Sequence, residues 1–158
     1  MERVDAPLRL YGTPSDKPVL AWSWVDEQLR AAGTYWLTVP DVGRYPHPRP
    51  VWGVWHADHL HLSVGSPLVA RALEPGTAVT AHLDSGTDVV IVEADVVGVT
   101  TDVELIRRYD AKYDWRYDID EHGPLTTIQP RTVLAWRSAG WAGRDGFQQT
   151  GRWRYESA

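Results

Sequence analysis

The chain of 158 residues contains no cysteine. Disulfide bonds, thiolate metal sites and thiol nucleophiles are therefore excluded. No apolar run approaches the length of a membrane span, and the opening residues MERVDAPLRL lack the apolar core of a secretory signal. These absences predict a cytoplasmic protein that has no membrane partner.

Basic residues are outnumbered, because 16 lysines and arginines against 21 aspartates and glutamates give a formal net charge of −5. Proteins that bind a phosphate backbone usually carry a clustered basic face, so we expect no nucleic-acid partner. Aromatic residues are abundant instead, with nine tryptophans and seven tyrosines against one phenylalanine. Such rings often line sites for flat ligands or subunit interfaces, and an aromatic β core would use them equally well.

The length of the chain fits a single domain. We expect residues 1–22 to form an N-terminal arm, because they contain three prolines and little periodicity, and residues 23–158 to form the domain. Runs rich in β-branched and aromatic residues between turn residues predict strands. The predicted strands are 34–39, 47–56, 59–64, 78–84, 88–99, 126–137 and 150–155, of which 126–137 is one strand or two because Pro130 interrupts it.

Three helices are predicted before and between these strands. The first has Ser23 as its N-cap, carries Asp26 and Glu27 in its first turn, and ends before Gly33. The second begins with Ser66 as its N-cap. Six or seven strands with about three helices predict a mainly β protein with helices, built as a small β-barrel.

The third helix opens with a capping box formed by Thr101 and Glu104. Apolar and aromatic residues then recur every three or four positions and should make one face of this helix: Val103, Ile106, Tyr109 and Tyr113. Residues 114–124 are polar and acidic and should form a surface loop.

The strand at 47–56 is preceded and entered by three prolines in step, Pro46, Pro48 and Pro50. Residues two apart in a strand point their N–H groups to the same edge, so these prolines remove donors from one edge only. The sheet must open or end along that edge, and normal pairing can resume from Val51. A barrel with one split seam satisfies this pattern, and such a seam offers room for a ligand or a second protomer.

Three histidines flank the predicted turn at Ala57-Asp58: His56, His59 and His61. A two-residue turn would place all three imidazoles on one face of the hairpin, which is a geometry that a metal could use. No carboxylate stands at a clear spacing beside them, so we predict that the hairpin binds no metal. Metal-dependent chemistry at these histidines is the minor alternative.

Several segments in this order resemble a known family. They are TYWLTV, GR-x-P-H-x-RPVWGVW, L-x-L-S-x-G-S, ARAL and V-x-x-HL, followed by AKYDW, VLAWR and GRWRY. The series covers roughly residues 24–155 and resembles the split β-barrel flavin-binding family of pyridoxamine 5'-phosphate oxidase. It is most similar to the actinobacterial branch that includes flavin- and deazaflavin-dependent reductases.

The resemblance implies a homodimer that holds FMN or the deazaflavin coenzyme F420 in each of two grooves between the subunits. It also implies an oxidoreductase that transfers a hydride between this cofactor and a small organic substrate, with the cofactor supplying the chemistry. No residue presents itself as an obligatory catalytic acid or base.

The same resemblance assigns cofactor-binding residues. Those expected along the ring system are Arg49, Pro50, Val51, Trp52 and Gly53, where glycine would allow close approach and tryptophan could stack. Those expected at the phosphate are Ser63, Gly65, Ser66 and Arg71. Lys112, with its neighbours Tyr113 and Trp115, is expected to reach the cofactor, and Trp153, with Arg152, to close the groove from the partner chain.

Two positions depart from the family pattern. Leu68 and Val69 stand where family members usually carry another basic residue early in the phosphate helix. Without the resemblance, Ser66 would be a plain N-cap and Arg71 a solvated side chain. The alternative function is therefore a non-catalytic small-ligand-binding dimer that keeps the split barrel.

Overall fold

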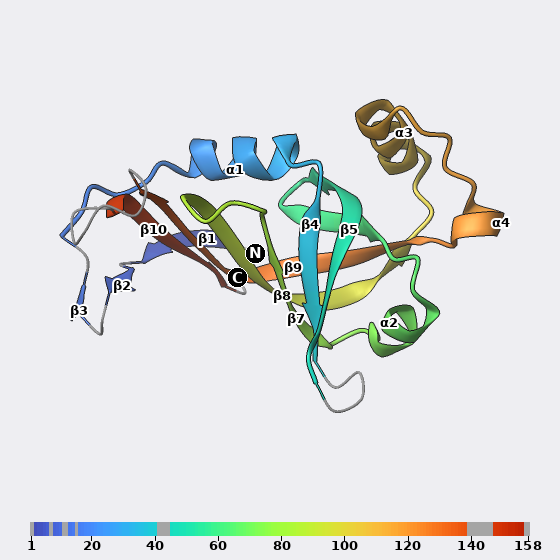
Figure 1. Cartoon of the computed structure of the whole chain (residues 1–158), viewed down its shortest axis with the longest axis horizontal. Helices are drawn as coiled ribbons and strands as arrows, with labels where there is room; N and C mark the ends of the chain where they lie inside the picture. Colours follow the sequence, from blue (N-terminus) through green and yellow to red (C-terminus); the bar gives the residue numbers. More distant parts are fainter. Residues whose placement is uncertain are drawn as a thin grey trace.

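Six antiparallel strands close a barrel in the computed structural model of the chain, which describes residues 2–6, 8–10, 13–14, 16–40, 45–138 and 147–156. These strands are β4 (Tyr35–Val39), β5 (His47–His56), β6 (His59–Ser63), β7 (Ala78–His82), β8 (Asp88–Thr100) and β9 (Leu125–Ser138). Their order around the barrel is β9-β6-β5-β4-β7-β8, and β8 pairs back onto β9 (Figure 1). The predicted mainly β fold with a barrel is confirmed.

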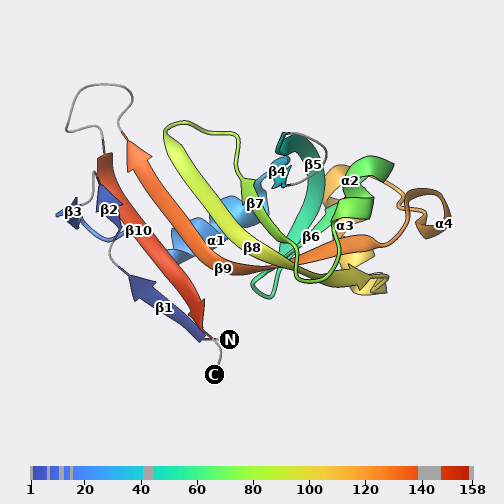
Figure 2. The same cartoon turned by 90° about the horizontal axis from the view of Figure 1, so that it is seen from below.

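The sheet continues beyond the barrel on the outer edge of β9. There β10 (Phe147–Glu156) pairs with β9, and β1 (Glu2–Ala6) pairs with β10 (Figure 2). Two short strands, β2 (Arg9–Leu10) and β3 (Thr13–Pro14), form a separate small sheet. Part of the expected arm therefore forms an edge strand of the main sheet.

Four helices connect or flank the strands: α1 (Trp22–Ala31), α2 (Pro67–Ala72), α3 (Val103–Tyr113) and α4 (Ile119–His122). None of the described helices is long and apolar enough to cross a membrane. The predicted start of α1 was wrong, because its N-cap is Ala21 and no acidic residue lies in its first turn. The helix begins early because Trp22 packs edge-on against Trp153, with ring centroids 5.3 Å apart, and such packing outweighs a capping preference.

The predicted cap of α3 was also wrong. Asp102, and not Thr101, caps this helix, because its Oδ1 accepts from the amides of Glu104 and Leu105 at 2.9 and 3.0 Å. Of the predicted face, Ile106, Tyr109 and Tyr113 pack inward, whereas Val103 is 74% exposed and Leu105 is buried in its place. Leu105 packs in the same cluster as Val54 of β5.

The interruption expected at Pro130 is a local irregularity within one continuous strand. Opposite β8, Thr132 pairs with Glu93 and Pro130 pairs with Ala94, which leaves Arg131 as an extra residue between the two pairs. A bulge at this point accommodates a proline that has no N–H to donate.

Apolar side chains form two cores. The larger fills the barrel and reaches α1 and β10; its fully buried members include Leu29, Leu37, Leu60 and Trp153. The smaller lies between α3 and the outer face of β5 and β9, and it consists of Val54, Leu105, Tyr109, Tyr117 and Leu125. The second core fixes α3 beside β5, where the site described next is built.

Candidate functional site

Strand β5 changes its partner halfway along its length. Residues 47–51 pair with β4, whereas residues 52–56 pair with β6 on the other edge. Pro48 and Pro50 lie opposite Thr38 and Trp36 but have no N–H to donate, so the ladder to β4 must use the alternate residues of β5. The prolines therefore face the edge along which β6 has already ended at Ser63, and the predicted opening of the sheet is confirmed.

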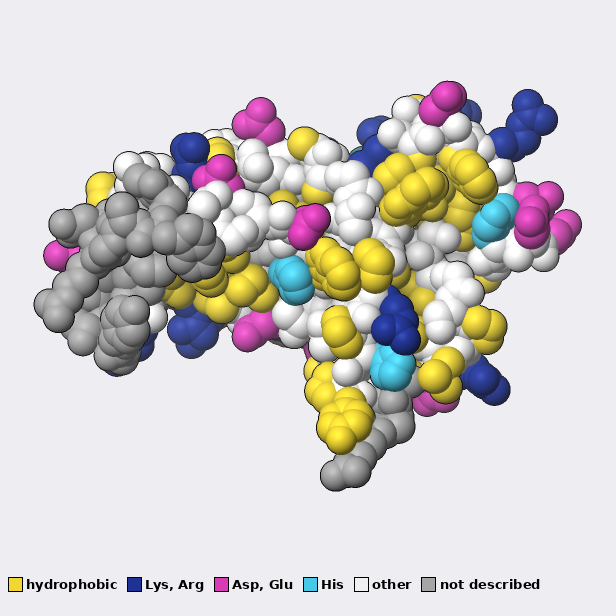
Figure 3. Space-filling view, viewed as in Figure 1, with side chains coloured by type: hydrophobic (Ala, Val, Ile, Leu, Met, Phe, Trp, Pro, Cys, Tyr) yellow, Lys and Arg dark blue, Asp and Glu magenta, His cyan; other side chains and the backbone are white. Residues whose placement is uncertain are grey.

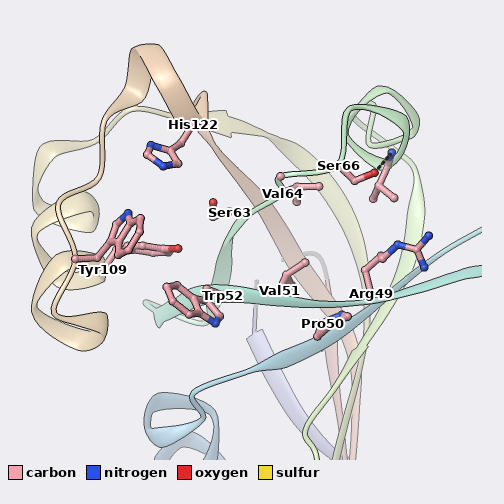
Figure 4. A pocket seen from close by; sticks show the side chains of 12 residues that line it. Arg49, Pro50, Val51, Trp52, Ser63, Val64, Ser66, Tyr109 and His122 are labelled. Atoms are coloured by element: carbon pink, nitrogen blue, oxygen red, sulfur yellow. Dashed lines mark hydrogen bonds between the residues drawn. The ribbon is translucent and has the colours of Figure 1, made fainter.

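A cavity of about 400 Å³ lies at this opening, between β5, the end of β6, the start of α2 and the α3–α4 region (Figure 4). Its lining residues are Arg49, Pro50, Val51, Trp52, Ser63, Val64, Gly65, Ser66, Val69, Tyr109, Trp115 and His122. Most of the residues that the sequence assigned to a cofactor thus meet around one cavity, although they come from separate segments of the chain.

One end of the cavity is formed by Arg49 and the start of α2. Ser66 is the N-cap of α2, as predicted, and its Oγ accepts from the amide of Val69 at 3.4 Å. The exposed Arg49 donates from Nη1 to its neighbour's carbonyl, Pro48 O, at 2.9 Å. Arg71 is exposed, donates from Nε to Pro67 O at 3.1 Å, and is not among the residues that line the cavity.

Aromatic side chains form the wall next to α3. The indole of Trp52 lies flat on the ring of Tyr113, with centroids 4.7 Å apart and an interplanar angle of 4°. Trp115 meets Trp52 edge-on at 6.0 Å. Trp52 and Trp115 remain 43% and 47% exposed, so two large rings face solvent or a ligand at this wall.

The opposite end of the cavity contains polar groups that the sequence analysis did not assign to the site. Tyr109 points toward Ser63 (Figure 4), and burial raises the pKa of its hydroxyl to about 12, so the group is protonated at neutral pH. Tyr117 Oη donates to Gly123 O at 3.0 Å. His122 Nδ1 donates to Asp118 O at 2.8 Å. The four-residue spacing of Tyr109, Tyr113 and Tyr117 was the signal available in the sequence.

Three other predicted site residues lie behind the cavity wall or away from it. A Cβ on Gly53 would lie 2.5 Å from His61 O, so the backbone of β6 and not a ligand occupies that space. Lys112 Nζ donates to Gly53 O at 2.9 Å, and burial lowers its pKa to about 8. Trp153 is 1% exposed within the barrel core and does not reach the cavity.

The histidine hairpin forms a separate surface. Ala57 and Asp58 both have positive φ, 49° and 57°, which confirms the two-residue turn and places His56 opposite His59. His61 is buried, and burial together with the nearby His59 lowers its pKa to about 4. Among the described residues, no group of three or more histidines and carboxylates is arranged to hold a metal ion. That the hairpin binds no metal stays a prediction.

Comparison with known proteins finds structures that share the fold of this chain at low sequence identity. No model of a known protein family and no curated protein matches the sequence. Solved structures do match. A protein from Listeria innocua, provisionally named a pyridoxamine 5'-phosphate oxidase, is 18% identical with a TM-score of 0.55 over 73% of this chain and 98% of that one.

Two further structures cover similar shares. An FAD-binding protein from Mycobacterium smegmatis is 14% identical, with a TM-score of 0.51 over 87% of this chain and 99% of that chain. An F420 reductase is 16% identical, with a TM-score of 0.52 over 77% and 98% of the two chains. These likenesses establish the split β-barrel fold of the pyridoxamine 5'-phosphate oxidase type.

Proposed function

We propose that this protein is an oxidoreductase that holds FMN or coenzyme F420 in the cavity beside Trp52 and transfers a hydride between that cofactor and a small organic substrate. The observation that carries the proposal is the cavity at the open edge of β5, walled by Pro50, Val51 and the half-exposed Trp52. The flavin- and F420-related names of structures with the same fold support it.

The residues present fit a flat, phosphorylated cofactor. A volume of about 400 Å³ lies within the range of small-molecule sites, and the apolar strand residues with the stacked indole suit a planar ring. Arg49 and Ser66 lie at the same end of the cavity (Figure 4), where a guanidinium and a hydroxyl can bind phosphate oxygens. When bound, the cofactor would supply the hydride-carrying ring system.

The other end of the cavity suits the substrate. The hydroxyl of Tyr109 is a neutral donor there, and His122 presents an imidazole beside Trp115. These groups can hydrogen-bond a small organic molecule against the ring, while Trp52 and Trp115 exclude water from the contact. The protein would thus bind and orient both reactants.

A homodimer is part of the proposal. Hydrophobic side chains gather on the face that carries β4, β5 and α3 (Figure 3). Large exposed side chains include Trp52 and Trp115, which line the cavity, and Leu68 on α2. A second subunit would cover them, and a stable interface of this kind should bury more than roughly 1,000 Å² in total.

A specific observation favours the second candidate, a non-catalytic small-ligand-binding dimer. Arg49 is the one arginine or lysine among the described residues that line the cavity. Leu68 is half exposed, and the side chain of Val69 is fully buried in the core, so neither adds a charge for a phosphate. A protein of this kind would bind an uncharged ligand in preference to FMN.

Titration separates the two functions. Purified protein is titrated with FMN, F420 and riboflavin, together with Trp52→Ala and the matched variant Trp36→Ala, whose indole stacks on His82 outside the cavity. The proposal expects saturable binding of FMN or F420 that weakens in Trp52→Ala and not in Trp36→Ala. Binding of riboflavin as tight as FMN, with no turnover, would favour the ligand-binding protein.

A further inference from the structure

Strand β5 leaves two backbone groups without a strand partner at Gly53. The ladder to β4 ends at the pair Tyr35–Val51. Gly53 lies two residues further on, so its N–H and C=O point to the same edge as those of Val51, where β4 no longer extends. Gly53 is buried, and buried backbone groups that remain unpaired are costly.

Helix α3 supplies the missing partners from two adjacent side chains. Tyr113 Oη accepts from Gly53 N at 2.9 Å and donates to Gly53 O at 3.0 Å. Lys112 Nζ donates to the same carbonyl at 2.9 Å and to Tyr35 Oη at 3.0 Å. Tyr35 in turn donates to Leu29 O of α1. These contacts tie α1, β4, β5 and α3 together at the end of the ladder.

The same two side chains also hold the neighbouring cavity wall. The ring of Tyr113 is the surface on which Trp52 lies flat, and Trp52 is the residue next to Gly53. The ammonium group of Lys112 lies over two rings, 4.8 Å from the centroid of Tyr35 and 5.2 Å from that of Tyr113. Both aromatic faces attract its positive charge. None of the ion pairs in the described part of the chain joins Lys112 to a carboxylate.

We propose that Lys112 and Tyr113 are positioning residues, which replace the missing strand at Gly53 and thereby hold the indole of Trp52 flat on the cavity wall. The three residues Gly53, Lys112 and Tyr113 form what we name the Gly53 clamp. The effect of the clamp on a ligand rests on the proposed function, whereas the clamp itself does not.

Amide exchange tests the clamp without a ligand. In glycine-labelled wild-type protein, the Gly53 amide should be protected although no strand pairs with it on that edge. Tyr113→Phe keeps the ring and removes the acceptor, so exchange at Gly53 should accelerate by about tenfold, the effect of losing roughly 1.4 kcal/mol. Gly151, which pairs with Ala135 in β9, reports any global change.

The matched control is Tyr117→Phe, whose hydroxyl bonds Gly123 O and Ser63 but not Gly53. This control should leave Gly53 exchange unchanged relative to Gly151. Rapid Gly53 exchange in the wild type, or equal Gly53 exchange in wild type and Tyr113→Phe, overturns the clamp. The wild-type measurement decides the matter even if Tyr113→Phe does not fold.

FMN titration then tests the consequence for the cavity. Tyr113→Phe and Lys112→Met should each weaken FMN binding severalfold, because losing bonds to Gly53 loosens β5 beside Trp52. Tyr113→Phe keeps the ring on which Trp52 lies, so a loss in this variant reports the bonds and not the stacking. A wild type that binds neither FMN nor F420 would refute the proposed function. The Gly53 clamp would then be tested by the amide-exchange result alone. Unchanged FMN affinity in both variants, with tight wild-type binding, refutes the positioning role.

Discussion

Replacing Gly53 with alanine tests whether this glycine is required for packing against β6. The resemblance expected it to let a cofactor approach the backbone. In the structure, the added methyl group would lie 2.5 Å from His61 O and 2.7 Å from Leu62 Cδ2. The first of these atoms is a backbone oxygen of the paired strand β6, so it cannot rotate away as the end of a flexible side chain could.

The size of the effect follows from that contact. Forcing a methyl group into a packed site costs about 1–3 kcal/mol, and a shift of β5 would weaken the bonds of the Gly53 clamp by about 1 kcal/mol more. The lower entropy of the unfolded alanine chain offsets about 0.4–1 kcal/mol. A net loss of about 1–3.5 kcal/mol lowers the melting temperature by roughly 2–14 °C in a domain of this size.

Thermal and urea denaturation of the ligand-free protein measure this loss. Gly33→Ala is the matched control, because no atom lies within 4 Å of its added Cβ and its φ lies outside the left-handed region. We expect Gly33→Ala to stay within about 1 kcal/mol of the wild type. Equal stability of the two variants would refute the reasoning.

Other changes give further tests. Because the pKa of Lys112 falls from 10.5 to about 8 on folding, the unfolded chain binds more protons between these values, and the free energy of unfolding should rise with pH across this window. Urea denaturation should show this rise in the wild type and not in Lys112→Met. The ionisation of Tyr35 and Tyr113 affects both proteins alike. Arg49→Ala should lower the affinity for FMN about ten- to a hundredfold and leave that for riboflavin nearly unchanged, since a charge-assisted bond to phosphate is worth about 1.5–3 kcal/mol. Arg71→Ala should show the same selectivity if its side chain turns to the phosphate, and equal losses of affinity for both ligands would assign Arg71 to the fold. Chelator should leave the melting temperature unchanged, and a clear drop would place a metal at the histidine hairpin. Light scattering should report a dimer at micromolar concentration, and a monomer would remove the shared groove.

Local patterns in the sequence predicted the elements that local chemistry determines. The hairpin of β5 and β6 has the predicted turn, because Ala57-Asp58 separates two strand-forming runs and both residues adopt positive φ. The prolines indicated the open edge, because a missing N–H restricts pairing whatever the tertiary context. The resemblance named most of the chain segments that line the cavity, and the prolines indicated the edge at which they meet.

Tertiary contacts determined what the sequence could not show. Gly53 faces β6 and not a ligand, which depends on how closely β6 approaches in the folded barrel. Lys112 reaches the end of the β4 ladder only because the smaller core docks α3 on β5. His122 and Tyr109 enter the cavity from residues on either side of the 114–118 loop, whose path no periodicity describes.

The absorption spectrum of the purified protein, with mass spectrometry of what denaturation releases, tests the central claim most directly. The proposed function predicts a yellow protein that releases FMN or F420, or that takes up one of them to an equimolar amount on titration. A colourless protein that binds neither cofactor at saturating concentration would contradict it.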